Sequence, residues 1–127
     1  MSNEKMIKNW LLKAENDIAT ANDLYKSKHY DWCLFIWHLA IEKALKAKIS
    51  SLKKEYLYTH KLVKLAELAE FPINKKVLEQ LREITSYNIE ARYDDYKLSF
   101  YKKATKEYTS KWVIICEDIF KIIIKTI

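Results

Sequence analysis

The segment "ARYDDYKLSFY", residues 91–101, carries the side chains best suited to chemistry on an anion. Arg92 offers a planar guanidinium, which binds phosphate or carboxylate through two parallel hydrogen bonds. Asp94 and Asp95 follow almost at once and are ion-pair partners or proton acceptors by type. We therefore expect Arg92, Asp94 and Asp95 to form a ligand-binding site. The alternative is that Arg92 only ties helix ends together, through Asp95 or Glu42.

A second polar group lies within the otherwise apolar segment 30–51. His38, Glu42 and Lys46 recur at i, i+4 and i+8, a spacing that places them on one face of a helix. Lys43 lies beside them in sequence. We expect Lys43 and Lys46, with the lysines near 97 to 106, to widen the positive surface of the ligand-binding site, and Glu42 to be an ion-pair partner of these bases. We expect His38 to make a local contact with Glu42 on the helix surface.

His60 follows Thr59, which has the side chain of a helix N-cap. One interpretation is that His60 binds a backbone carbonyl next to that cap. The other is that folding brings His60 close to Arg92, where its near-neutral pKa suits proton transfer.

Helical periodicity supplies the elements that position these groups. The 127 residues include no glycine and one proline, which disfavours tight hairpins and excludes glycine-rich phosphate loops. Apolar residues recur at three and four positions and predict helices at about 3–27, 30–51, 60–70, 75–89 and from 103 to the end. Four long helices and one short helix predict a single all-α domain over residues 1–127, an antiparallel up-and-down four-helix bundle with one additional short helix.

The segment 30–51 is apolar nearly all round, because Phe35 and Leu39 share the face of its polar residues. A helix of this kind is usually buried on two sides. A second subunit could cover the second side, so the sequence predicts a homodimer.

The net charge of +6 is uneven. Seven lysines oppose one glutamate over residues 43–64, and five oppose one glutamate over 97–111. These segments are either solvated helix faces or attract phosphates. The two cysteines lie in apolar stretches, and no metal-ligand cluster or cofactor motif occurs. Without a signal-peptide core or an apolar run of about 20 residues, we expect a cytoplasmic protein that does not enter membranes.

Four runs resemble the HEPN-domain proteins, in the order in which that family has them. They are "WLLKAENDIATANDLY", "FIWHLAIEKALKA", "YTHKLVKLAEL" and "YNIEARYDD". The resemblance covers nearly the whole chain, and Asp94 stands where the family pattern often has proline. It implies a helical bundle that commonly dimerises and often accompanies a minimal nucleotidyltransferase in a toxin–antitoxin module.

Many HEPN proteins are metal-independent ribonucleases, whose motif is an arginine, four to six residues and a histidine. Arg92 matches the arginine, but the histidine positions hold Lys97, Leu98 and Ser99. The resemblance also implies that Tyr101 occupies the place of a tyrosine that some partner transferases adenylylate, if Ser99 takes the histidine position.

Three functions follow. The first is a homodimeric module that binds a nucleotide or partners a nucleotidyltransferase, without an intact nuclease motif. The second is a ribonuclease in which Arg92 stabilises the phosphorane and Tyr96, His60 or an aspartate moves protons. The third is a sequence-independent nucleic-acid binder that uses the basic segments, with a strong salt dependence.

Overall fold

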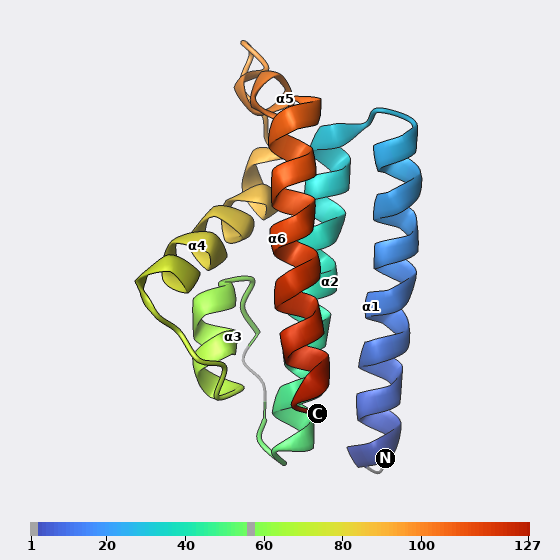
Figure 1. Cartoon of the computed structure of the whole chain (residues 1–127), viewed down its shortest axis with the longest axis vertical. Coiled ribbons are helices and arrows are strands. Elements are labelled where there is room, and N and C mark those ends of the chain that lie inside the picture. The colour runs from blue at the N-terminus through green and yellow to red at the C-terminus, as the bar shows by residue number, and fades with distance from the viewer. Residues whose placement is uncertain (1–2, 56–57) are drawn as a thin grey trace.

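The computed structural model describes residues 3–55 and 58–127, and these residues form six helices without a strand (Figure 1). The helices are α1 (Asn3–Lys26), α2 (Tyr30–Ser51), α3 (Leu62–Leu68), α4 (Lys75–Glu90), α5 (Ser99–Lys103) and α6 (Lys106–Lys125). The all-helical prediction is therefore confirmed. Within the described ranges, no helix combines the length and the apolar character needed to cross a bilayer.

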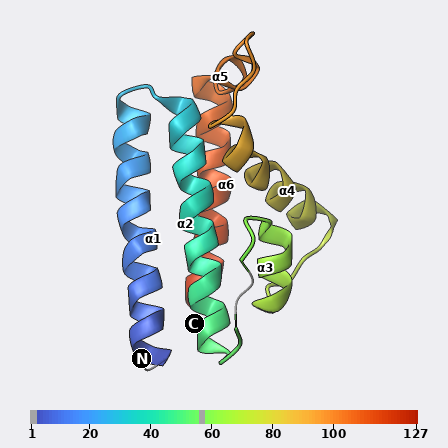
Figure 2. The same ribbon diagram turned by 180° about the vertical axis from the view of Figure 1, so that it is seen from behind.

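The four long helices alternate in direction, as predicted for an up-and-down bundle (Figure 1). α1 and α4 run one way, α2 and α6 the other, and α4 is inclined to the other three. α2 lies at the centre, because α1, α3, α4, α5 and α6 all pack against it. One side of α2 faces outward between α1 and α4, with no helix in front of it (Figure 2).

The hydrophobic core is built around α2, where Trp32 is the one exposed residue of the helix. The side chains of Trp37, Ile41 and Leu45 are almost completely buried. Cys33 is buried in the same core, and burial raises the pKa of its thiol to about 12. Cys33 and Cys116 are both free and buried, as expected for small core residues.

The start of α3 differs from the prediction that Thr59 caps it. The helix begins at Leu62, and the Thr59 hydroxyl instead accepts a hydrogen bond from the backbone N–H of Lys61 (3.1 Å). The N–H of Leu62 donates to the Thr85 hydroxyl of α4 (3.1 Å). A cap supplied by another helix has no signature in the local sequence.

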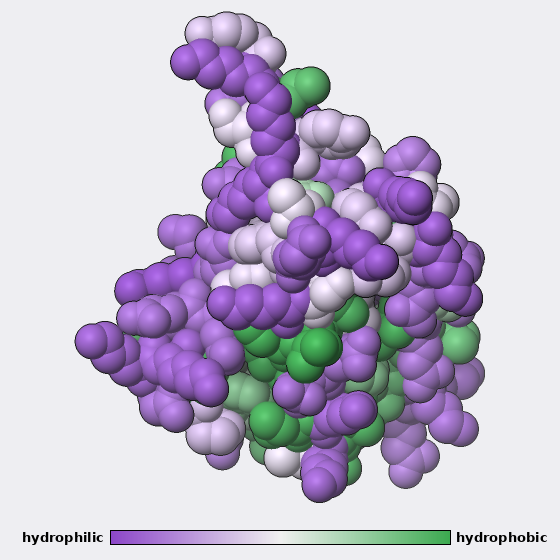
Figure 3. All heavy atoms as spheres, turned by 45° about the horizontal axis from the view of Figure 1, so that its top comes forward, coloured by the Kyte–Doolittle hydropathy of each residue, from purple (hydrophilic) through white to green (hydrophobic). Residues whose placement is uncertain are grey.

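The last helix also begins later than predicted, at residue 106. Thr105 caps it, because its hydroxyl accepts a hydrogen bond from the N–H of Tyr108 (3.1 Å). The preceding residues form the separate short helix α5, which projects from one end of the bundle with a mostly hydrophilic surface (Figure 3). Hydrophobic side chains gather lower on the same view. Ile114 and Ile122 of α6 are among the exposed large hydrophobic residues.

Candidate functional site

Arg92 lies just beyond the C-terminal end of α4, and its exposed guanidinium is held in a fixed position. Nε donates to the Asn88 carbonyl oxygen (2.7 Å), and Nη2 donates to the Asn88 side-chain oxygen (2.5 Å). Cζ lies 5.9 Å from the centre of the Phe35 ring of α2, within cation–π range. Within the described part of the chain, two of the five N–H donors of Arg92 are thus used, and three remain for an anion.

The expected ion pair between Arg92 and Asp95 or Glu42 was wrong. Arg92 forms no ion pair with any carboxylate in residues 3–55 and 58–127. The guanidinium is instead hydrogen-bonded to Asn88, which lies one helical turn earlier.

Asp94 and Asp95 bind the start of α5 instead of Arg92. Asp95 accepts hydrogen bonds from the N–H of Ser99 (3.0 Å) and from its hydroxyl (2.7 Å). Asp94 accepts from the N–H groups of Phe100 (3.0 Å) and Tyr101 (2.9 Å). The hydrogen bonds from Ser99 lower the pKa of Asp95. Both carboxylates are therefore structural caps of α5, which occupies most of their hydrogen-bonding capacity.

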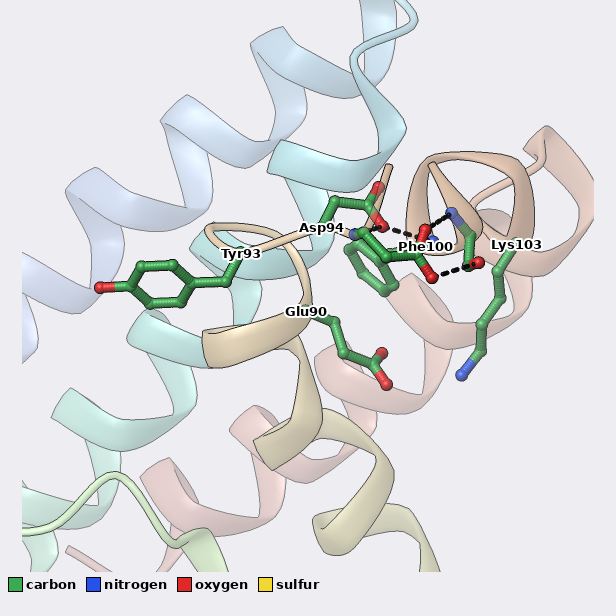
Figure 4. A pocket seen from close by; sticks show the side chains of 7 residues that line it. Glu90, Tyr93, Asp94, Phe100 and Lys103 are labelled. Atoms are coloured by element: carbon green, nitrogen blue, oxygen red, sulfur yellow. Dashed lines mark hydrogen bonds between the residues drawn. The ribbon is translucent and has the colours of Figure 1, made fainter. Parts of the chain in front are cut away.

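A cavity of about 210 Å³ opens beside these caps (Figure 4). It is lined by Glu90, Tyr93, Asp94, Asp95, Ser99, Phe100 and Lys103. Asp94 lies on the side of α5, whereas the Tyr93 ring extends away from it (Figure 4). With three carboxylates and one lysine in its lining, this cavity is unsuited to an anionic ligand.

Glu42 of α2 and His60, which precedes α3, form a polar pair that we call the Glu42–His60 pair. His60 Nδ1 and Glu42 Oε1 are 2.7 Å apart, a charge-assisted hydrogen bond. The Glu42 side chain is 6% exposed, and the His60 side chain is 61% exposed. A buried carboxylate thus orients an imidazole that solvent reaches. The prediction that His60 binds a backbone carbonyl was wrong.

His38 is completely buried beside this pair. It makes the predicted contact with Glu42 at i+4, but in the interior and not on the helix surface. Its Nε2 lies 3.0 Å from the His60 carbonyl oxygen and 3.9 Å from Glu42 Oε1. Burial, the largest cause, lowers the pKa of His38, although the contact with the His60 carbonyl and the charge of Glu42 act in the opposite direction. His38 is therefore neutral at physiological pH, and it lies within the electrostatic reach of both Arg92 and the pair.

The two lysines expected at the site differ in direction. Lys46 Nζ lies 3.2 Å from Glu42 Oε2, so it belongs with the Glu42–His60 pair. Lys43 Nζ lies 2.6 Å from Asp17 Oδ2 and therefore turns toward α1. The residues described contain no cluster of three or more His, Cys, Asp or Glu that could hold a metal ion.

Tyr96 and Tyr101, the two tyrosines considered for the site, are both exposed. Tyr96 is 91% exposed, and its ring contacts Lys97 (5.7 Å from Nζ to the ring centre). Tyr101 is 59% exposed on α5. Leu98 has a positive φ of 56°, in the left-handed region, where the chain turns into α5.

Fold and site together define a small up-and-down helical bundle with one polar cluster between α2, the start of α3 and the end of α4. The HEPN domain family model matches residues 7–127, and the chain belongs to the HEPN-domain family. The crystal structure of TT1696 from Thermus thermophilus is similar in fold, with a TM-score of 0.79 and 19% identity. That match covers 95% of this chain and 98% of the other. No protein with a curated description matches the chain.

Proposed function

We propose that this HEPN-domain protein is a homodimeric module that binds a nucleotide or partners a nucleotidyltransferase, of toxin–antitoxin type. The observation that carries this function is the guanidinium of Arg92, which Asn88 fixes while leaving N–H donors exposed. Preorganised guanidinium groups bind phosphate and carboxylate oxygens well. Because Lys97, Leu98 and Ser99 fill the positions of the motif histidine, binding is favoured over RNA cleavage.

The homodimer is supported by the outward side of α2. Trp32 is 43% exposed there, and Phe35 and Leu39 are half-buried. Lys43 reaches α1 and Phe35 contacts Arg92 near α4, so this surface lies between those two helices. An isologous contact on it would bring two copies of Arg92 close together. Light scattering at tens of micromolar tests it: we expect a dimer that Trp32→Lys dissociates, and a monomeric wild type refutes it.

Nucleotide binding is tested by thermal shift with ATP, GTP and AMP. At ten times the Kd, a ligand stabilises the fold by about 1.4 kcal/mol, which raises the Tm by roughly 4–7 °C. Arg92→Ala should abolish most of that shift, whereas the exposed Lys121→Ala on α6 should retain it. An equal shift in both variants would assign the nucleotide to another site.

A transferase partner is tested on Tyr101, whose 59% exposure leaves its hydroxyl open to modification. After incubation with a minimal nucleotidyltransferase encoded beside this chain and ATP, intact mass should show one added AMP. Tyr101→Phe should lack it, while Tyr96→Phe, which removes the hydroxyl of a more exposed tyrosine, should keep it. An unchanged mass for the wild type contradicts this modification.

The alternative function is a metal-independent ribonuclease with an altered motif, and the Glu42–His60 pair favours it. His60 would take the proton of the 2′-hydroxyl while Arg92 stabilises the charge of the phosphorane. As the bond from phosphorus to the 5′ oxygen breaks, the protonated imidazole would return a proton to that leaving oxygen. Purified protein would be incubated with transfer RNA and messenger RNA. Cleavage that disappears in both Arg92→Ala and His60→Gln supports the enzyme, and the absence of wild-type cleavage rejects it.

A further inference from the structure

The Glu42–His60 pair leaves one ring nitrogen of His60 open to solvent. A carboxylate only accepts hydrogen bonds, so Nδ1 of His60, 2.7 Å from Glu42 Oε1, is the nitrogen that carries the proton. In the neutral ring, the lone pair is therefore on Nε2. Among the described residues, no group is hydrogen-bonded to this Nε2, and 61% of the His60 side chain is exposed. Nε2 is thus a nucleophile that solutes can reach.

Two contacts from α2 hold that nitrogen in a fixed direction. Glu42 orients the ring, and His38 Nε2 lies 3.0 Å from the His60 carbonyl oxygen, which anchors the backbone of the same residue. Both partners are buried, because the side chain of His38 is completely enclosed and that of Glu42 is 6% exposed. Buried partners are locked by their packing, so the imidazole of His60 is preorganised.

The charges around the ring suit an anionic group. Lys46 Nζ lies 3.2 Å from the second oxygen of Glu42, so one carboxylate serves a lysine and an imidazole. The charge of Arg92 reaches His38, whose ring centre is 6.1 Å from that of His60. Glu42 is the one carboxylate among the described residues that contacts His60. Two cations therefore outweigh one carboxylate around the exposed nitrogen, which favours a dianion there.

We propose that Nε2 of His60 is a phosphoryl acceptor, which takes the phosphoryl group of an acyl phosphate. The lone pair of Nε2 forms the new bond to phosphorus while the bond from phosphorus to the acyl oxygen breaks. The carboxylate of the donor leaves with that electron pair, no proton moves, and nothing is oxidised or reduced. The ring becomes positively charged in this step because Nδ1 keeps its proton, and the buried carboxylate of Glu42 stabilises that charge.

A covalent adduct distinguishes this activity from proton transfer by the same ring. As a general base in RNA cleavage, His60 would return to its unmodified form after each turnover. As an acceptor, His60 stays modified until water or another acceptor takes the phosphoryl group. The activity needs neither a nucleotide on Arg92 nor a second subunit, so it goes beyond the proposed function.

The test is incubation of the intact protein with acetyl phosphate at neutral pH, followed by mass spectrometry under conditions that preserve acid-labile nitrogen–phosphorus bonds. We expect a phosphoryl group on His60, which peptide mapping separates from the acetyl groups that the reagent adds to lysines. His29 is an internal control, because it is exposed and its ring makes no hydrogen bond with the described residues. His60 should react about tenfold faster than His29, since a carboxylate that orients an imidazole contributes roughly 10–100-fold to its function.

Variants of the pair connect this reactivity to the structure. His60→Gln should remove the adduct, and Glu42→Gln should slow its formation roughly tenfold or more. Glu79→Gln, at an exposed position of α4, should react like the wild type. In urea, where the contact with Glu42 is lost, His60 and His29 of the wild type should react at the same rate.

Each of four results overturns the proposal. They are the absence of an adduct on His60, equal rates at His60 and His29 in the folded protein, a rate difference that persists in urea, and an unchanged rate in Glu42→Gln. None of these results affects the dimer or the Arg92-dependent thermal shift, so the proposed function is tested separately.

Discussion

Glu42→Gln is the substitution whose effect the structure specifies best. The two oxygens of Glu42 accept from His60 (2.7 Å) and Lys46 (3.2 Å), and the side chain is 6% exposed. Glutamine keeps the shape but loses the charge, and its amide nitrogen must face one of the two donors. Hydrogen bonds to charged groups contribute about 1.5–3 kcal/mol each. Because His60 is largely solvated, its bond counts at the low end, and we expect a total loss of about 2–4 kcal/mol.

Urea unfolding followed by circular dichroism measures this loss. A domain of this size has a stability of about 5–15 kcal/mol, so Glu42→Gln should fold but unfold at a clearly lower urea concentration, with an unchanged m-value. Glu79→Gln is the matched control, since Glu79 is exposed on α4 and makes no ion pair among the described residues. Its effect should stay within about 0.5 kcal/mol.

A double-mutant cycle with His60→Gln then isolates the Glu42–His60 pair. Residues in direct contact show interaction energies of about 0.5–3 kcal/mol. If Glu42→Gln costs no more than Glu79→Gln, or if the two effects of the cycle simply add, the pair does not stabilise the fold and the reasoning is refuted.

Three further predictions concern other parts of the chain. Asp95→Asn should accelerate amide hydrogen exchange over residues 97–103 but not in α1. In the wild type, the same local acceleration should be seen only when the pH falls below 3.8, because the pKa of Asp95 is lowered from that value. In the wild type, the buried Tyr87 hydroxyl lies 2.8 Å from the Tyr108 hydroxyl. Tyr108→Phe removes this hydrogen-bond partner and should lower the free energy of unfolding, measured in urea, by about 1–3 kcal/mol. Burial holds the pKa of His38 below 6.5, so the unfolded chain takes up the proton at a higher pH than the folded chain does. The free energy of unfolding should therefore fall as the pH drops below about 6.5, by at most about 1.4 kcal/mol per pH unit. His38→Gln should remove this contribution to the pH dependence.

The helical fold could be predicted because patterns within each segment of the sequence indicate where most of the helices lie. Asn74 has a cap side chain directly before an amphipathic run, and its oxygen accepts from the N–H of Val77 (2.8 Å) as such a cap should. α3 was harder, because the cap of Leu62 comes from Thr85, 23 residues later. α5 was missed because its five residues are too short to show periodicity.

The candidate site was predicted in composition but only partly in pairing. Arg92 binds Asn88 and not the carboxylates considered for it. Glu42 does pair with a lysine, Lys46, as expected, but it also binds His60. The partner of Arg92 is Asn88 at i−4, a spacing that the sequence does contain. The partner of Glu42 is His60, 18 residues away across a loop, and no local pattern encodes that contact.

These contacts decide which of the three histidine positions could hold a histidine without breaking the turn. Ser99 gives both its N–H and its hydroxyl to Asp95, so histidine there would break a cap of α5. Leu98 stands at a left-handed backbone position that directs the chain into the same helix. Only Lys97 is free to change, because its backbone N–H alone contacts Asp95 (3.1 Å). In this chain, residues 97–99, where the nuclease motif of the family has its histidine, thus form part of a capped turn. The imidazole that this chain presents to solvent beside a carboxylate belongs to His60, on another element.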